Sequence, residues 1–122
     1  MSFNWKRLDH VQLAAPIGSE AKAIHFFKDI LLMKQIEKPE NLKKRGGVWF
    51  QFGDYQLHIG IEDPFQPAKK AHPAFEVEHL DGLKDHLTNH HIEFMDDNNL
   101  PGANRIYVND PFGNRLELLE WK

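Results

Sequence analysis

The sequence feature that most constrains the fold is a repeated spacing of four side chains that can ligate a metal ion. Nearly equal intervals separate His10 from His58 and His72 from Glu117. Each of the four lies in a short run typical of a β-strand. Two similar intervals indicate one structural unit used twice, with a ligand in its first and last strands. Joining the two units would collect nitrogen and oxygen donors suited to a divalent transition metal.

The order of the expected elements supports this repeat. Alternating apolar and polar residues indicate strands, and apolar residues at helical spacing indicate helices. In the first unit we expect a strand at 8–14, a helix at 20–33, a short strand at 34–37, a charged loop at 39–45, and strands at 48–52 and 56–61. In the second unit we expect a strand at 72–77, a helix at 80–90, and strands at 92–95, 104–109 and 115–121. The sequence therefore predicts an α+β fold.

Alternation also sorts the strand residues by face. One face of each strand is aliphatic and is expected to pack on the helices. The opposite face collects histidines, amides, aromatic rings and one carboxylate, with little Lys, Ser or Thr. Its members are His10, Gln12, Trp49, Gln51, Gln56, His58, His72, Arg105, Tyr107 and Glu117. This composition is more typical of a lined cavity than of a solvated surface.

Length and composition limit the number of domains, the kinds of partner and the location that the chain is expected to have. The 122 residues are expected to form one domain, 1–122, with one unit at about 8–62 and the other at about 72–121. A net charge of −3 gives no general attraction to nucleic acid or anionic lipid. The absence of cysteine excludes disulfides and thiolate zinc sites. No apolar run suits a signal peptide or a membrane span, so a cytoplasmic location is expected.

Three segments carry a resemblance to a known family. They are Leu8-Asp9-His10-Val11, His72-Pro73-Ala74-Phe75, and the run from Asn109 to Leu118, which contains an Asp-Pro-x-Gly-Asn-x-x-Glu pattern. Through them the chain resembles the vicinal oxygen chelate superfamily, which includes glyoxalase I, fosfomycin- and bleomycin-resistance proteins and extradiol dioxygenases. The resemblance implies two βαβββ modules that form a curled mixed sheet around a cup. It also implies a homodimer, often with cups completed across the subunit interface.

The resemblance further implies a metal site. The family's ligand positions correspond to His10, His58, His72 and Glu117, which would bind a divalent metal: Zn, Ni, Mn, Fe or Co. Glyoxalase-like members often have glutamate at the second position, so His58 departs from the pattern and makes the site less negative. Without His58, the other three match both the facial triad of non-haem iron oxygenases and the manganese site of fosfomycin-resistance proteins. Glu117, the only carboxylate of the set, would be both ligand and catalytic base.

Five more residues on the polar face are candidates for substrate binding. Gln12 and Gln56 could orient a water near the metal, and Trp49 could form an apolar wall. Arg105 and Tyr107 could contact an anionic group and a carbonyl or hydroxyl of the substrate. The alternatives are a core aromatic for Trp49, an edge-of-sheet arginine for Arg105 and a packed ring for Tyr107.

Together these residues favour a divalent-metal-dependent lyase, isomerase or transferase that acts on a small, oxygen-chelating substrate. The alternative is a metal-free protein that binds a small molecule or an antibiotic, as bleomycin-resistance proteins do. A ring-cleaving dioxygenase is less favoured, because the four-module architecture of typical members is absent. The predicted partner is a small molecule, with no role for nucleic acid or a membrane.

Overall fold

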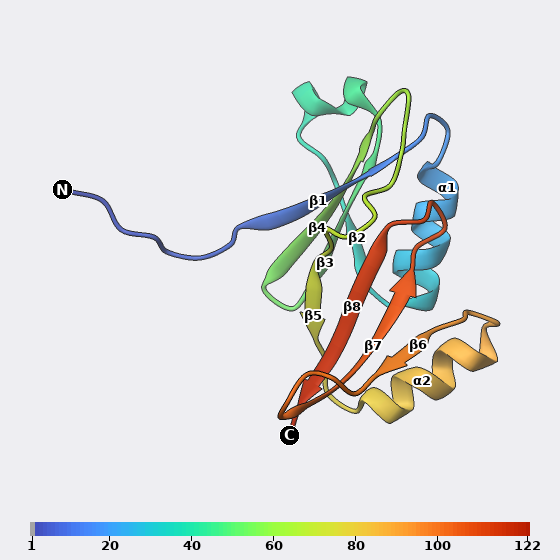
Figure 1. Cartoon of the computed structure of the whole chain (residues 1–122). Helices are drawn as coiled ribbons and strands as arrows, with labels where there is room; N and C mark the ends of the chain where they lie inside the picture. Colours follow the sequence, from blue (N-terminus) through green and yellow to red (C-terminus); the bar gives the residue numbers. More distant parts are fainter. Residues whose placement is uncertain (1) are drawn as a thin grey trace.

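The computed structural model describes residues 2–122, so Met1, which the predicted domain includes, lies outside the described residues. The chain forms an α+β fold (Figure 1). The first unit contains β1 (His10–Ala15), α1 (Glu20–Ala23), the π-helix η1 (Ile24–Ile30), β2 (Lys34–Ile36), the 3-10 helix η2 (Glu40–Arg45), β3 (Val48–Phe52) and β4 (Tyr55–Ile61). The second unit contains β5 (Ala74–Glu76), α2 (Leu80–Asn89), β6 (Met95–Asp97), β7 (Ala103–Asn109) and β8 (Arg115–Trp121). None of the helices within 2–122 has the length and apolar character needed to cross a membrane.

Each unit forms its own four-stranded mixed sheet. The strand order is β1-β4-β3-β2 in the first sheet and β5-β8-β7-β6 in the second. In both sheets the first strand is parallel to the last, and the other neighbours are antiparallel. The predicted fold class and the repeated order of elements are therefore confirmed. This topology places the first and last strands of each unit side by side, so their side chains on one face are neighbours.

The helices cover the aliphatic faces of the two sheets. Phe27 of η1 is fully buried and packs on Phe50 of β3, with ring centroids 5.5 Å apart. Leu80 and Leu87 of α2 are buried in the same apolar core as Leu118 of β8. Burial of each such side chain stabilises the fold by roughly 1.5–3 kcal/mol. The helices therefore leave the polar face of each sheet to side chains that carry chemistry.

Two expected elements of the first unit differ in the structure. The helix at 20–33 is a short α-helix that continues as η1, where the N–H of Leu31 donates to the carbonyl of Phe26. That bond spans five residues, which is the π-helical pattern. The charged segment at 39–45 contains η2 and is not an irregular loop. Local spacing predicts a helix but does not separate the α from the π register.

In the second unit, the strand expected at 92–95 lies later, at β6, where Met95 pairs with Tyr107. Ile92 and Phe94 instead pack against the core from the preceding segment, so their apolar character reports burial and not a strand. His72 precedes β5 and is not part of it, because β5 begins at Ala74.

The turn between β7 and β8 also connects the two units. Asp110 Oδ1 accepts hydrogen bonds from the N–H groups of Phe112 and Asn114, at 2.9 and 2.8 Å. Asn114 Nδ2 donates to Asp110 Oδ2 and to the carbonyl of Ala14 in β1, both at 2.8 Å. Burial raises the pKa of the Asp110 carboxyl, while these hydrogen bonds act to lower it. One amide group therefore closes the turn of the second unit and holds it to the first.

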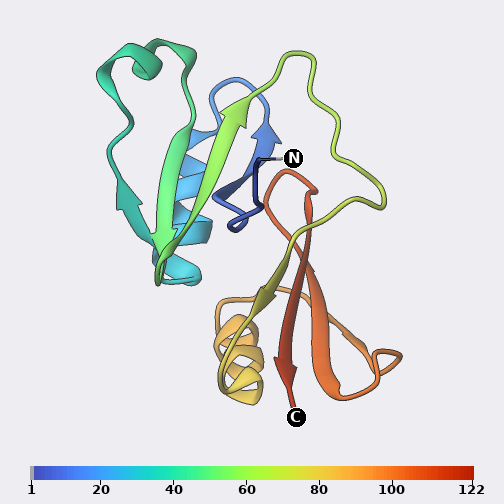
Figure 2. The ribbon, with the colours of Figure 1, turned by 90° about the vertical axis from the view of Figure 1, so that its left-hand side faces the viewer.

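The N-terminal arm, residues 2–9, extends away from both sheets in Figure 1 and therefore points toward the viewer in Figure 2. Phe3, Trp5 and Leu8 are exposed, and Trp5 retains 93% of its accessible surface. Phe3 and Trp5 meet edge to face, with centroids 6.2 Å apart. A cluster of large apolar side chains held in solvent is typical of a surface that contacts another molecule.

Candidate functional site

The first pair of predicted ligands lies on the first sheet. His10 of β1 and His58 of β4 stack with ring centroids 4.2 Å apart. The other face of the His58 ring lies on the Trp49 indole, 3.7 Å away and nearly parallel. His58 Nε2 lies 2.8 Å from Gln56 Oε1. These four side chains are called half-site one below, and Gln12 lies beside them in register with His58.

Half-site one keeps one imidazole neutral. Burial is the main cause that lowers the pKa of His58 to about 4, and the nearby His10 and Lys38 act in the same direction. A neutral imidazole is the form that binds a metal, so His58 needs no deprotonation near neutral pH. Because Gln56 Oε1 can only accept, Nε2 of His58 carries the proton and Nδ1 keeps a free lone pair.

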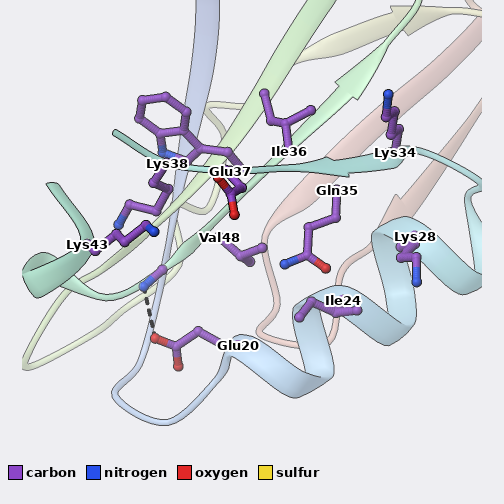
Figure 3. Close-up of a pocket in the computed structure, with 12 residues that line it drawn as sticks. Glu20, Ile24, Lys28, Lys34, Gln35, Ile36, Glu37, Lys38, Lys43 and Val48 are labelled. Atoms are coloured by element: carbon purple, nitrogen blue, oxygen red, sulfur yellow. Dashed lines mark hydrogen bonds between the residues drawn. The ribbon is translucent and has the colours of Figure 1, made fainter. Parts of the chain in front are cut away.

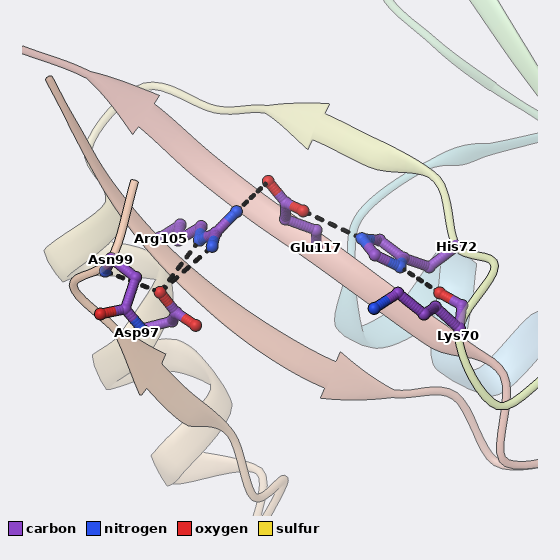
Figure 4. Close-up of polar contacts among 6 residues, drawn as sticks. All are labelled: Lys70, His72, Asp97, Asn99, Arg105 and Glu117. Carbon is purple, nitrogen blue, oxygen red and sulfur yellow. Dashed lines mark hydrogen bonds and ion pairs between the residues drawn. The ribbon is translucent and has the colours of Figure 1, made fainter. Parts of the chain in front are cut away.

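The second pair of predicted ligands lies at the second sheet, with Glu117 in β8 and His72 in the segment just before β5 (Figure 4). His72 Nε2 is 3.0 Å from Glu117 Oε1, and Arg105 Nη1 donates to Glu117 Oε2 at 3.3 Å. Glu117 is buried, with 7% of its surface accessible, so both of its oxygens are held by partners rather than by water. His72, Glu117 and Arg105 are called half-site two below.

Residues that sequence reasoning missed orient these ligands. His10 Nδ1 lies 2.9 Å from Asp9 Oδ2, and His72 Nδ1 lies 2.7 Å from the carbonyl of Lys70. The Asp9 carboxylate is an acceptor, so Nδ1 of His10 is the protonated nitrogen and its Nε2 keeps a lone pair for a metal. Both nitrogens of His72 face oxygen acceptors, since its Nε2 lies 3.0 Å from Glu117 Oε1, so a metal would take the place of the proton between His72 and Glu117. The hydrogen bond from His10 is the main cause that lowers the pKa of the Asp9 carboxyl. This pattern, a ligand histidine held by an oxygen on its far nitrogen, is common at metal sites.

Asp97 has the same role toward Arg105. Asp97 Oδ1 accepts from Arg105 Nε and Nη2, both at 3.2 Å, and from the N–H of Asn99 at 2.8 Å. The Asn99 N–H and the Arg105 guanidinium hold the pKa of the Asp97 carboxyl below its usual value. Arg105 therefore already has two carboxylate partners, Asp97 and Glu117. It is better placed to fix Glu117 than to receive an anionic substrate.

Tyr107 lies between half-site two and the guanidinium group of Arg115. Its ring meets His72 edge to face at 5.5 Å, and the Arg115 guanidinium lies 3.9 Å from the ring centroid. The ring therefore packs beside the ligand and is covered by Arg115 on one side.

The structure brings the four predicted ligands together as two pairs, not as one cluster. His10 and His58 belong to the first unit, and His72 and Glu117 belong to the second. Among residues 2–122, no three His, Asp or Glu side chains are grouped so that they could hold one metal ion. A single copy of the chain thus presents two half-sites, each with two donors.

Two larger hollows flank the first sheet. One, of about 660 Å³, lies between β1 and β5 and is lined by His10, Gln56 and Phe75 among others. The other, of about 570 Å³, lies between the helices and β2, and half of the residues that line it are charged (Figure 3). Only the first hollow is lined by a predicted metal ligand.

The chain is similar to a known protein family and to several solved structures. The family model described as Glyoxalase/Bleomycin resistance protein/Dioxygenase superfamily matches residues 7–118. No curated protein matches the chain. A solved structure of a glyoxalase family protein from Bacillus anthracis is 49% identical, with each chain covered over 100% of its length and a TM-score of 0.97.

Two more distant structures share the fold. A fosfomycin resistance protein from Listeria monocytogenes, solved as a mutant with Mn(II) and 1S,2S-dihydroxypropylphosphonic acid, is 18% identical, with a TM-score of 0.80 and coverage of 98% and 95% of the two chains. Lactoylglutathione lyase from Agrobacterium tumefaciens is 19% identical, with a TM-score of 0.68 and coverage of 90% and 91%.

Proposed function

The chain belongs to the Glyoxalase/Bleomycin resistance protein/Dioxygenase superfamily, and on that premise we propose that it is a divalent-metal-dependent lyase, isomerase or transferase acting on a small oxygen-chelating substrate. The observation that carries the proposal is that hydrogen bonds already orient the two pairs of metal-ligating side chains. Each of the three histidines is held through one nitrogen by an oxygen acceptor, at 2.7 to 2.9 Å. Glu117 adds the single carboxylate, as expected for a borderline divalent ion.

We propose that the metal site is completed in a homodimer, where half-site one of one copy meets half-site two of the other. Two donors are too few to hold a metal firmly, whereas four from two half-sites leave positions on the ion for substrate. The exposed N-terminal arm supports this arrangement, because it leads directly into β1 and His10. A second copy that covers Trp5 would at the same time lie beside half-site one.

The metal would be held by His10, His58, His72 and Glu117, with Zn, Ni, Mn, Fe and Co as candidates. The related fosfomycin resistance protein is complexed with Mn(II). When bound, the metal would stabilise negative charge that develops on the substrate oxygens. The chain's own contribution is the Glu117 carboxylate, which would move a substrate proton. Arg105 orients that carboxylate through Oε2, and Asp97 in turn orients Arg105.

A second candidate function is supported by the stack of three rings in half-site one. His10, His58 and Trp49 form a continuous aromatic surface that could hold a flat small molecule without any metal. This is the metal-free binding protein of the sequence analysis. It predicts a protein that takes up no divalent ion.

Elemental analysis of purified, untagged protein tests the proposal. We expect close to one equivalent of Mn, Fe, Co, Ni or Zn per chain, and loss of that metal in both His10→Ala and Glu117→Ala. An exposed histidine variant, His25→Ala, is the control and should keep its metal. If the protein contains no metal and takes up none after dialysis against these five ions, the metalloenzyme proposal is wrong and the binding protein is favoured.

Mixed dimers test where the site is completed. One variant chain, His10→Ala, lacks half-site one, and the other, Glu117→Ala, lacks half-site two. In a mixed dimer of the two, one site would combine both defects and the other would combine both intact half-sites. We therefore expect one metal per mixed dimer. A site built within one chain would give none, because every chain in the mixture carries a defect.

A further inference from the structure

A small cavity of about 150 Å³ lies at one end of the first sheet, beneath η2. Its lining comprises Gln12, Lys38, Leu42, Arg45, Gly46, Trp49, Ile59, Gly60 and Ile61. Cavities that take a whole drug-sized ligand measure about 300–1,000 Å³. This one is therefore the size of a single functional group. It combines hydrogen-bond donors with apolar walls, and none of its lining residues is acidic.

The residues that line the cavity carry a net positive charge. The Glu20 carboxylate lies near Gly46 but outside the lining, where it accepts a hydrogen bond from the N–H of Gly47 at 2.8 Å. The ion pair formed within η2 joins Lys43 to Glu40, at 3.0 Å. In the described part of the chain, neither Lys38 nor Arg45 forms an ion pair. Lys38 is half-buried, and its Nζ donates to the carbonyl of Gly46, which fixes the ammonium group at the cavity wall. Two cations without carboxylate partners in a protein of net charge −3 form a local site for an anion.

Gly60 opens the space in which the Gln12 amide lies. A Cβ built on Gly60 would stand 2.6 Å from Gln12 Nε2, closer than any real contact. The glycine thus leaves room for the Gln12 amide, which lines the same cavity as Lys38 and Arg45. An amide N–H adds a directed donor to the charges of Lys38 and Arg45.

The cavity adjoins half-site one. Trp49 lines it, and the same indole stacks on His58 at 3.7 Å. Gln12 lines it too, and lies opposite His58 in the pairing of β1 with β4. A ligand group in the cavity would therefore be attached to a molecule that reaches the ring stack.

We propose that this cavity binds the anionic group of the substrate, a carboxylate or a phosphoryl or phosphonyl group, with Lys38 and Arg45 as counter-charges and Gln12 as a neutral donor. The inference rests on the proposed function in one respect, that half-site one faces the substrate. It adds the substrate class: a small anion whose charged end lies under η2 while its oxygens reach the ligands. Lys38 and Arg45 are specificity residues here, since they bind and orient one end of the molecule.

Titration of the ¹⁵N-labelled full chain with three probes tests the proposal: inorganic phosphate, methylphosphonate and acetate. Binding should shift the amide signals of Gly46 and Gly60 and the indole signal of Trp49. Chelator-treated protein is measured in parallel, so that an anion bound to metal is distinguished from an anion in the cavity. Preference for the phosphorus probes identifies a phosphoryl or phosphonyl group, and preference for acetate identifies a carboxylate. If no probe shifts these signals, the proposal is overturned.

Substitutions of lysine distinguish a specific anion site from nonspecific attraction of anions by surface charge. Lys38→Met should weaken binding of the preferred probe by roughly ten-fold or more, as expected for loss of a charge-assisted hydrogen bond. Lys38→Arg should restore much of it. Lys43→Met, which removes the same charge from a lysine paired with Glu40, should change binding less than two-fold. Equal effects of Lys38→Met and Lys43→Met would overturn the proposal.

Gly60→Ala provides a charge-neutral test. The added methyl group displaces the Gln12 amide and narrows the cavity, so binding of the probe should be lost while the net charge is unchanged. Unchanged binding in this variant would place the anion elsewhere. Metal content is measured on the same samples. An intact metal site without anion binding refutes only this inference, whereas anion binding without metal refutes only the metalloenzyme.

Discussion

Removing the Asn114 side chain should lower the free energy of unfolding more than removing most other side chains of this protein, although Asn114 contacts none of the candidate metal ligands. Asn114 has 7% of its surface accessible and Asp110 has 4%. Asn114→Ala deletes two hydrogen bonds, to Asp110 Oδ2 and to the carbonyl of Ala14, each 2.8 Å long. It therefore leaves one carboxylate oxygen and one carbonyl oxygen without the donor that faces them.

The magnitude follows from what remains in the buried turn. A buried acceptor that loses its partner costs about 1–3 kcal/mol, and more when it is charged. Two such groups give about 2–6 kcal/mol. Asp110 keeps the two N–H donors on Oδ1, and a water can enter the space of the deleted amide, so we expect about 2–4 kcal/mol. The free energy of unfolding of most domains is only about 5–15 kcal/mol, so this loss is large.

Urea denaturation followed by circular dichroism measures this loss. The matched control is Asn109→Ala, which removes the same side chain from an exposed position beside the same turn and should change the free energy of unfolding by less than about 0.5 kcal/mol. A loss below about 1 kcal/mol in Asn114→Ala, or equal losses in the two variants, would refute the argument that one amide joins the two units.

Three further predictions concern the backbone, a helix start and the arm. Gly47 has φ of +87°, and a Cβ there would stand 2.1 Å from the carbonyl oxygen of Ile59, so Gly47→Ala should cost about 3 kcal/mol or more in urea denaturation; Gly53→Ala, at φ of +54° with open space around it, should cost only about 1 kcal/mol. Hydrogen bonds from the N–H groups of Leu80 and His79 lower the pKa of Glu120 in the folded chain, so its stabilising effect is complete above about pH 4.5 and is lost as the pH falls further. The melting temperature of Glu120→Gln should therefore lie below that of the native protein at pH 7 and approach it at low pH, whereas the exposed Glu93→Gln should show no such convergence. Trp5→Ser should shift sedimentation from dimer to monomer, and an unchanged dimer would remove the arm from the proposed interface.

The fold was largely predictable because the period-two and helical patterns report burial directly. β8 lies at the predicted 115–121, and both units have the predicted order of strands and helix. The predictions are wrong where a buried side chain does not indicate the type of secondary structure to which it belongs. Ile92 and Phe94 are apolar because they pack on the core, yet the strand begins only at Met95. The π-helical register of η1 likewise depends on how Phe26 and Phe27 fit against the sheet, which local spacing does not contain.

The candidate site was predictable only in part. Strand pairing within a unit follows from its topology, so the contacts of His10 with His58 and of His72 with Glu117 could be expected. How the two units face one another depends on contacts between the sheets, which no pattern within one strand encodes. Lys38 was not singled out for the same reason, because its position beside Gln12 depends on the path of the chain through η2.

The continuity of the N-terminal arm with β1 has a thermodynamic consequence. In the proposed dimer, burial of Trp5 against a second copy and delivery of His10 to its half-site would be coupled, since only four residues lie between them. Metal affinity and self-association would then be linked, and each would strengthen the other by the same factor. Diluting the protein would therefore release metal, and removing the metal with a chelator would dissociate the dimer. The concentration of the chain in the cell would set how much of it is loaded with metal.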